Sequence, residues 1–169
     1  CTLNSFLEKM TKDELVKIAR KYSVKGITTL KKADAVERVM NVILENTKVA
    51  LELMEESILR YIEELLKESG LKKYQCNEMI YINYLRNRGL AFSGVKNDEA
   101  FVVMPEELKS VIGIQLNKEL KDKARLNEEV IKAISGMVYY YGICKIDFIK
   151  SNINNIFGTS FNEAYINTL

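Results

Sequence analysis

Basic side chains near the N-terminus are the residues of this sequence best suited to chemistry, and that chemistry is the binding of phosphate groups. Residues 1–50 contain ten lysines and arginines against six aspartates and glutamates, whereas residues 51–169 contain fifteen against seventeen. The net charge of +2 therefore arises from the N-terminal part of the chain. Such a basic excess attracts a nucleic-acid backbone, although a solvated lysine-rich surface gives the same pattern.

Residue types that enzymes use for catalysis form no recognisable motif. Histidine is absent, and Cys1, Cys76 and Cys144 lie far apart without paired spacing. This pattern argues against a zinc site and a disulfide framework, and it suits a reducing compartment. Adjacent glutamates such as Glu106 and Glu107 diverge by about 100° on a helix, so they do not form an acid–base pair. With no glycine-rich phosphate loop or nucleophile elbow either, we expect no catalytic residues, metal or cofactor.

Residues 11–43 are predicted to form two short helices joined by a loop. Thr11 is a favourable N-cap, and Glu14 three residues later completes a capping box. Apolar residues then recur at helical spacing to position 22 and again from about 30 to 43. Gly26 lies in the segment between them. Two such helices bury little surface, so we expect the unit to need support from the rest of the chain.

The middle of the chain changes from helical to extended patterning. Helices are predicted at about 49–67 and 77–88 from their apolar spacing. Two short apolar runs within 90–104 flank a polar turn, which predicts a β-hairpin. Pro105, followed by two glutamates, is typical of a helix start. This order of two helices, a hairpin and a helix is that of a winged-helix unit.

The C-terminal third is predicted to be helical. After a polar stretch at 117–127, helices are expected at 126–141, 147–157 and 161–169. Their succession resembles a helix-turn-helix bundle, or a second winged helix that ends before its wing. Three consecutive tyrosines at 139–141 could stack on exposed bases. Three neighbours on a helix point in three directions, so we expect at least one of them to face the core.

The segment MTKDELVKIARKYSVKG, residues 10–26, is similar to the opening of SAP-like domains and of the N-terminal domain of the Rho transcription terminator. Its continuation ITTLKKADAV resembles their loop and second helix, except that Asp34 and Ala35 replace the usual Glu-Leu. The resemblance implies contacts with nucleic acid from the first helix and from the loop that leads into the second. The matching positions are Lys12, Lys25, Gly26, Lys31 and Lys32.

A second basic group is expected around the hairpin. Residues 85–108 resemble winged-helix ends found beside helicase cores, but the chain has no Walker motif. In a DNA-reading winged helix, residues of the helix before the wing could contact bases and phosphates (Tyr81, Asn83, Tyr84 and Asn87). Alternatively, the tyrosines could pack on the helix at 49–67. We expect Arg86, Arg88 and Lys96 to form a second phosphate-binding patch.

Together these patterns predict a mainly α protein with a small β-hairpin. The expected divisions are a SAP/Rho-N-like module at 1–47, a winged-helix-like module at 48–116 and a helix-turn-helix-like module at 117–169. The leading hypothesis is a bacterial, cytoplasmic accessory or regulatory protein that binds nucleic acid, duplex DNA ahead of RNA, without catalysis. The alternative is a protein-interaction or assembly module that uses winged-helix docking surfaces. No run of eighteen apolar residues occurs, so no membrane segment is expected.

Overall fold

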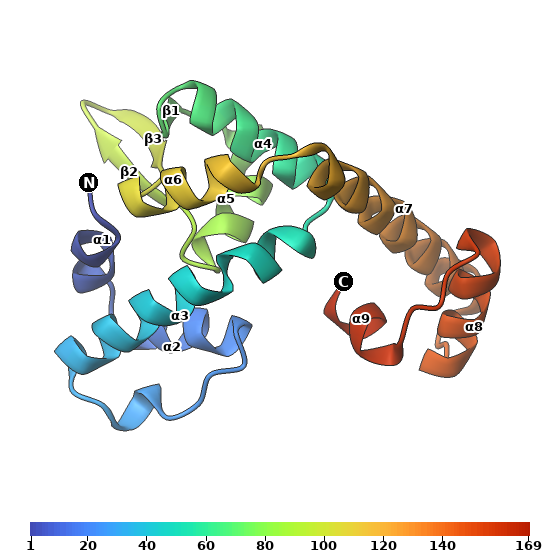
Figure 1. The fold of residues 1–169 in the computed structure, drawn as a ribbon. Coiled ribbons are helices and arrows are strands. Elements are labelled where there is room, and N and C mark those ends of the chain that lie inside the picture. The colour runs from blue at the N-terminus through green and yellow to red at the C-terminus, as the bar shows by residue number, and fades with distance from the viewer. The chain divides into compact units, whose positions relative to one another are not determined.

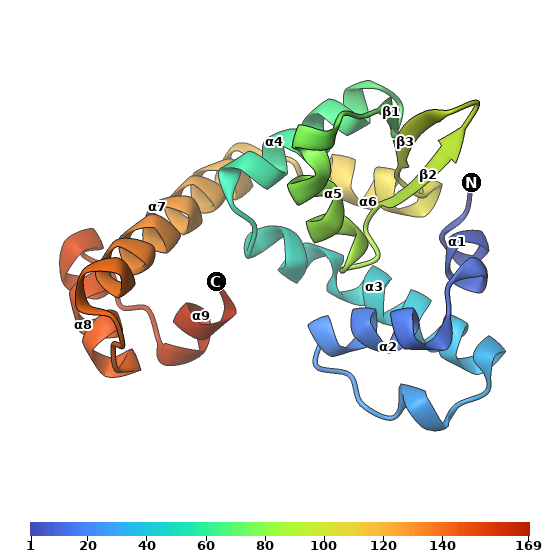
Figure 2. The same cartoon turned by 180° about the vertical axis from the view of Figure 1, so that it is seen from behind.

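A computed structural model describes residues 1–169, the side chain of Lys96 excepted, and divides into two compact units (Figures 1 and 2). Unit 1 comprises residues 1–50 and 60–116, and unit 2 comprises residues 51–59 and 117–169. The prediction of a mainly α protein with a small β-hairpin is confirmed. The division differs from the expected one, because residues 1–47 and most of 48–116 form a single unit.

Unit 1 combines helices with one small sheet. Its helices are α1 (Leu3–Lys9), α2 (Lys12–Lys21), most of α3 (Lys32–Glu52), most of α4 (Glu56–Lys67), α5 (Met79–Arg86) and α6 (Glu106–Gln115). Its strands are β1 (Leu71–Lys73), β2 (Phe92–Lys96) and β3 (Glu99–Val103), and two short 3-10 turns are η1 (Ile27–Thr29) and η2 (Cys76–Glu78). The last two residues of α3 and the first four of α4 belong to unit 2.

The predicted helix–loop–helix is present, with one helix longer than expected. The Thr11 backbone N–H donates to Glu14 Oε2 over 2.8 Å, which completes the capping box that starts α2. Gly26 adopts the left-handed conformation, with φ +85°, before η1. Helix α3 continues past the end expected near residue 43 to Glu52, and the helix predicted at about 49–67 begins only at Glu56. Within α3, the side chains of Asn46 and Thr47 donate to carbonyls one turn earlier, so these polar groups are satisfied inside the helix.

The sheet has the strand order β1–β3–β2, and all its pairings are antiparallel. The predicted hairpin is β2–β3, closed by Asn97 and Asp98, whose φ angles of 52° and 60° suit a two-residue type I′ turn. Strand β1 was not predicted, because three residues carry too short a pattern for sequence analysis. It gains its hydrogen bonds from β3, which lies at the centre of the sheet.

Contacts from α1, α2 and α3 to the sheet region make unit 1 one body. The ring of Phe6 in α1 stacks on Phe92 in β2 with centroids 4.6 Å apart. Gly89, which follows α5, has φ +68°, and a Cβ there would lie 2.4 Å from Ile43 Cδ1 of α3. Ile18 of α2 lies at the same point. The two predicted helices thus obtain the support that their small size requires.

Unit 2 is helical and has its own core. It contains α7 (Lys118–Tyr141), α8 (Ile146–Phe157) and α9 (Glu163–Thr168). Val130, Ile149, Ile153 and Ile166 are its buried centre. The polar stretch at 117–127 is the first part of α7, so the expected connection and the following helix are continuous. Across the described residues, no helix is both long and apolar enough to span a membrane.

Candidate nucleic-acid interface

Helix α2 carries a basic face that sequence analysis did not assign to the site. Lys17, Arg20 and Lys21 are exposed, and they make no ion pair within the described part of the chain. The opposite face of α2, with Leu15, Ile18 and Ala19, is buried. The basic residues recur at intervals of three and four, so helical periodicity alone could have placed them on one surface. Lys12, the first residue of α2, is half-buried.

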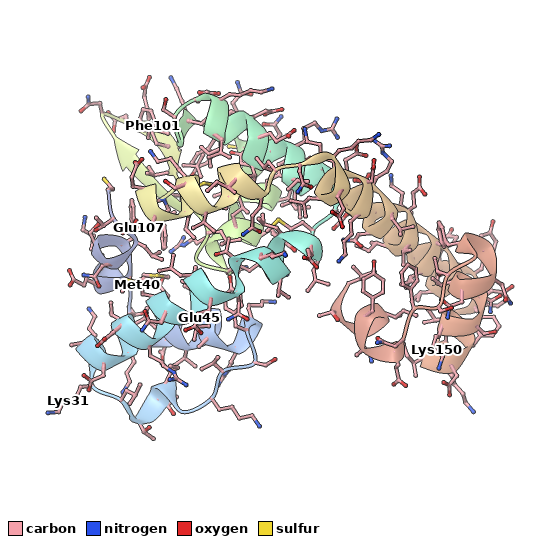
Figure 3. All side chains as sticks on the ribbon, viewed as in Figure 1. Lys31, Met40, Glu45, Phe101, Glu107 and Lys150 are labelled. Carbon is pink, nitrogen blue, oxygen red and sulfur yellow. The ribbon has the colours of Figure 1, made fainter. Side chains whose placement is uncertain are left out.

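The start of α3 presents the predicted pair Lys31 and Lys32 to solvent. Lys31 immediately precedes the helix and lies at its outer end in Figure 3. A lysine at this position cannot accept hydrogen bonds from the first N–H groups of a helix. Those groups and the two ammonium groups provide a local positive field, which Asp34 in the first turn partly offsets.

Two grooves flank α3, and the predicted residues are divided between them. Lys25, Gly26 and Arg38 line one groove of about 450 Å³, together with the carboxylates of Asp34 and Glu37. Lys32 lines the other groove, of about 550 Å³, which extends to α1. Each groove also has acidic lining residues, so a phosphate is better held at the outer edges than inside.

Arg86 is partly neutralised by an acidic residue of α2. Its guanidinium lies 3.0 Å from Glu14 Oε1, and the side chain stays 46% exposed. Hydrogen bonds from the backbone N–H and then the hydroxyl of Thr11, followed by the charge of Arg86, lower the pKa of the Glu14 carboxyl below its ordinary value. Glu14 therefore remains ionised at neutral pH and competes with any phosphate for Arg86.

Arg88 and two tyrosines of α5 have structural contacts. The Arg88 guanidinium lies over the ring of Tyr84, 3.6 Å from its centroid, and the Arg88 carbonyl accepts a 2.7 Å hydrogen bond from Tyr22 Oη. Tyr81 stacks on Tyr61 of α4 with centroids 5.2 Å apart. For Tyr81 the packing alternative thus holds, whereas Arg88 as a residue is partly exposed.

The face of α5 that remains open to solvent carries other residues. Ile80 is 71% exposed, and Asn83 and Asn87 are exposed one and two turns further along. Asn83 and Asn87 also line a groove of about 210 Å³ with Arg86 and Lys17. Lysine, arginine and amide groups thus meet between α2 and α5.

The hairpin does not join these groups. Lys96 ends β2, and its side chain lies outside the described part of the structure. The β2–β3 turn projects from the edge of unit 1 opposite to the loop between α2 and α3 (Figure 1). The predicted site residues thus form separate groups at the α3 start, the Lys25 loop, the end of α5 and the hairpin.

The expectation that one of the three tyrosines faces the core is wrong. Tyr139, Tyr140 and Tyr141 are 85%, 84% and 67% exposed. Neighbouring core-facing positions of α7 are filled by Ile134 and Met137, which pack against the buried centre of unit 2. The last turn of α7 extends beyond that core, so all three rings reach solvent and form an aromatic tip with the fully exposed Ile143.

No group of three or more potential metal ligands occurs among the described residues. Comparison of the chain with protein-family models, with curated proteins and with solved structures finds no match.

Proposed function

We propose that this chain binds nucleic acid, duplex DNA ahead of RNA, as an accessory or regulatory protein without catalytic activity. The carrying observation is the excess of solvent-exposed cations on α2, the loop and the start of α3. Residues 9–38 contain nine lysines and arginines against four acidic residues. Lys17, Arg20, Lys21, Lys25, Lys31 and Lys32 are all exposed and make no ion pair within the described residues.

Such cations bind phosphates by releasing condensed counterions, which gives affinity without reading sequence. Asp34 and Glu37 between the cations favour contacts along the outer edge of the surface rather than a deep phosphate pocket. Binding through this surface is therefore tolerant of sequence and sensitive to salt.

The connectivity of unit 1 adds support for the winged-helix interpretation. Helix α4 is followed by β1, then α5, then the β2–β3 hairpin, and β3 pairs between β1 and β2. A three-stranded antiparallel sheet beside an exposed helix is compatible with docking of that helix on DNA. In this chain the exposed helix is α5, which follows the single turn η2 and carries Ile80 and Asn83 on its exposed side.

The test compares duplex binding of the wild type with a Lys31→Ala/Lys32→Ala variant, by fluorescence anisotropy at 50 and 200 mM salt. Each phosphate contact contributes about 0.9 to the slope of log affinity against log salt, so the variant should lower this slope by about 2. The control variant Lys48→Ala/Lys67→Ala loses the same charge from exposed positions on α3 and α4.

The control should retain the wild-type slope. An equal loss in both variants would mean that only net charge matters, and it would refute the assigned surface. Absence of wild-type binding at 50 mM salt would refute the function itself.

A second candidate function is protein interaction or assembly. The observation in its favour is the aromatic tip of unit 2, where residues 133–144 contain no charged side chain while Tyr139, Tyr140 and Ile143 are exposed. Exposed apolar clusters of this kind mark contact sites on many proteins. This candidate gains support if the duplex assay is negative and if the wild type, but not Tyr139→Ser/Tyr140→Ser, self-associates in analytical ultracentrifugation.

A further inference from the structure

The open face of α5 is an uncharged stripe. Ile80, Asn83 and Asn87 are separated by three and four residues, so they lie along one line of the helix surface. The opposite line, with Ile82 and Leu85, is buried in unit 1. Neither asparagine side chain makes a hydrogen bond within the described residues, so both amide groups are available to a ligand.

Positive charge borders this stripe on both sides. Arg86 lies on one flank, in a groove that Lys17 and Glu14 of α2 also line, and it pairs there with Glu14 while its side chain stays 46% exposed. Arg88 lies on the other flank, where the ring of Tyr84 holds its guanidinium. An uncharged hydrogen-bonding strip with an arginine on each side is complementary to the major groove of DNA, where base edges lie between two phosphate backbones.

The residue types on the stripe discriminate between base pairs. An asparagine amide donates through its nitrogen to adenine N7 and accepts through its oxygen from the adenine N6 amino group. Guanine presents two acceptors instead, O6 and N7, which are bound most often by the paired donors of an arginine or a lysine. The nearest such side chain, Arg86, is held by Glu14 at 3.0 Å. An exposed isoleucine such as Ile80 can pack on the methyl group of thymine.

We infer that the Ile80–Asn83–Asn87 face of α5 selects A·T base pairs in the major groove of duplex DNA. This inference rests on the proposed function and adds a preference to it. The lysines of α2 and α3 supply affinity for any duplex, and α5 supplies the difference between sequences.

The test uses three duplexes of equal length and phosphate number, whose central segments contain A·T, G·C or inosine·C pairs. An inosine·C pair has the major-groove pattern of G·C but lacks the guanine N2 amino group, so its minor groove resembles that of A·T. We expect the A·T duplex to bind about tenfold more tightly than both others, which corresponds to one or two specific contacts.

Each other outcome identifies what fails. If inosine·C binds like A·T, the preference arises in the minor groove, and the role of α5 is refuted. If all three duplexes bind equally, the inference is refuted and the proposed function stands. If none binds at low salt, both are refuted.

Three variants test whether the preference for A·T pairs comes from α5. Asn83→Ala/Asn87→Ala should remove the difference between A·T and G·C duplexes and leave the salt slope unchanged, since no charge is lost. Asn155→Ala, an exposed asparagine on α8, should keep the preference. Lys31→Ala/Lys32→Ala should weaken all three duplexes by the same factor. A preference that survives in Asn83→Ala/Asn87→Ala, with circular dichroism showing a folded protein, would overturn the inference.

Discussion

Asn127 of α7 is fully buried in unit 2, and its side chain forms hydrogen bonds to the segment that connects α3 to α4. Its Nδ2 donates to the carbonyls of Glu52 and Met54, each over 2.9 Å, and its Oδ1 accepts from Tyr165 Oη of α9. The residues at the end of α3 have no further helical turn to supply these partners. We therefore expect Asn127 to be the most sensitive polar position of unit 2.

The expected cost of Asn127→Ala follows from the three lost bonds. Leaving a buried polar group unpaired costs about 1–3 kcal/mol, and the hydroxyl of half-buried Tyr165 can turn to water, so the total is about 3 kcal/mol. Asn127→Asp keeps the acceptor for Tyr165 but directs a carboxylate at two carbonyl oxygens, so it should cost at least as much. Tyr165→Phe removes one bond and should cost about 1 kcal/mol.

Hydrogen exchange followed by mass spectrometry measures these changes in unit 2 separately from unit 1. Protection of the α7–α9 amides should fall in Asn127→Ala by the factor equivalent to about 3 kcal/mol, and protection in α2 should not change. A double-mutant cycle with Tyr165→Phe should return a coupling of about 1 kcal/mol, because both single variants remove the same bond. If the stability of Asn127→Ala lies within about 0.5 kcal/mol of that of the wild type, this reasoning is refuted, because the three hydrogen bonds of the buried amide would then contribute no net stability.

Four further predictions concern unit 1. Gly89→Ala should lower the free energy of unfolding by about 2–4 kcal/mol, because the new Cβ is strained at a positive φ and overlaps with Ile43 of α3. Gly26→Ala, at φ +85° but with open space around it, should lower this free energy by only about 1 kcal/mol. Equal losses of stability in urea denaturation would contradict the overlap at Gly89. The buried Tyr61 hydroxyl has no hydrogen-bond partner within the described residues, so Tyr61→Phe should stabilise the protein by about 1 kcal/mol. Tyr22→Phe, which loses the hydrogen bond to the Arg88 carbonyl, should destabilise it by a similar amount. A loss of stability in both variants would refute the conclusion that the Tyr61 hydroxyl is unpaired. Burial raises the pKa of Tyr61 to about 12, above the ordinary value of about 10 that applies in the unfolded chain, so stability should fall as pH rises from about 10 to 12, and less so in Tyr61→Phe. Glu14→Gln keeps the capping box but removes the charge that pairs with Arg86. The slope of log affinity for duplex DNA against log salt should therefore become steeper by about 0.9, and an unchanged slope would exclude Arg86 from phosphate contact.

Local signals were enough to predict several elements from the sequence. The capping box of Thr11 and Glu14 marks the start of α2, and the residues that close the β2–β3 hairpin favour the conformation its turn requires. Pro105 precedes α6 as expected. In each case the deciding interactions lie within a few residues of one another, so the sequence pattern contains them. The basic face of α2 was not predicted, although its periodicity is visible without a structure and could have placed Lys17, Arg20 and Lys21 on one side of the helix.

Other features depend on residues far apart in the chain. Helix α1 obtains its support from Phe92, and β1 is a strand only because β3 pairs with it. Arg86 has its charge partner 72 positions earlier, and Asn127 bonds to carbonyls 73 and 75 positions before it. Composition and periodicity carry no information on such pairs, because they arise from packing of separate elements.

For the candidate interface the same distinction holds. The sequence by itself determined that basic residues concentrate near the N-terminus and that residues 11–43 form two helices with a loop between them. Only the tertiary structure decided which cations remain open to solvent: Arg86 is paired, Arg88 rests on Tyr84, and Lys31 and Lys32 are exposed. It also decided which side of α5 faces outward, because that side is whatever the core contacts of Ile82 and Leu85 leave free.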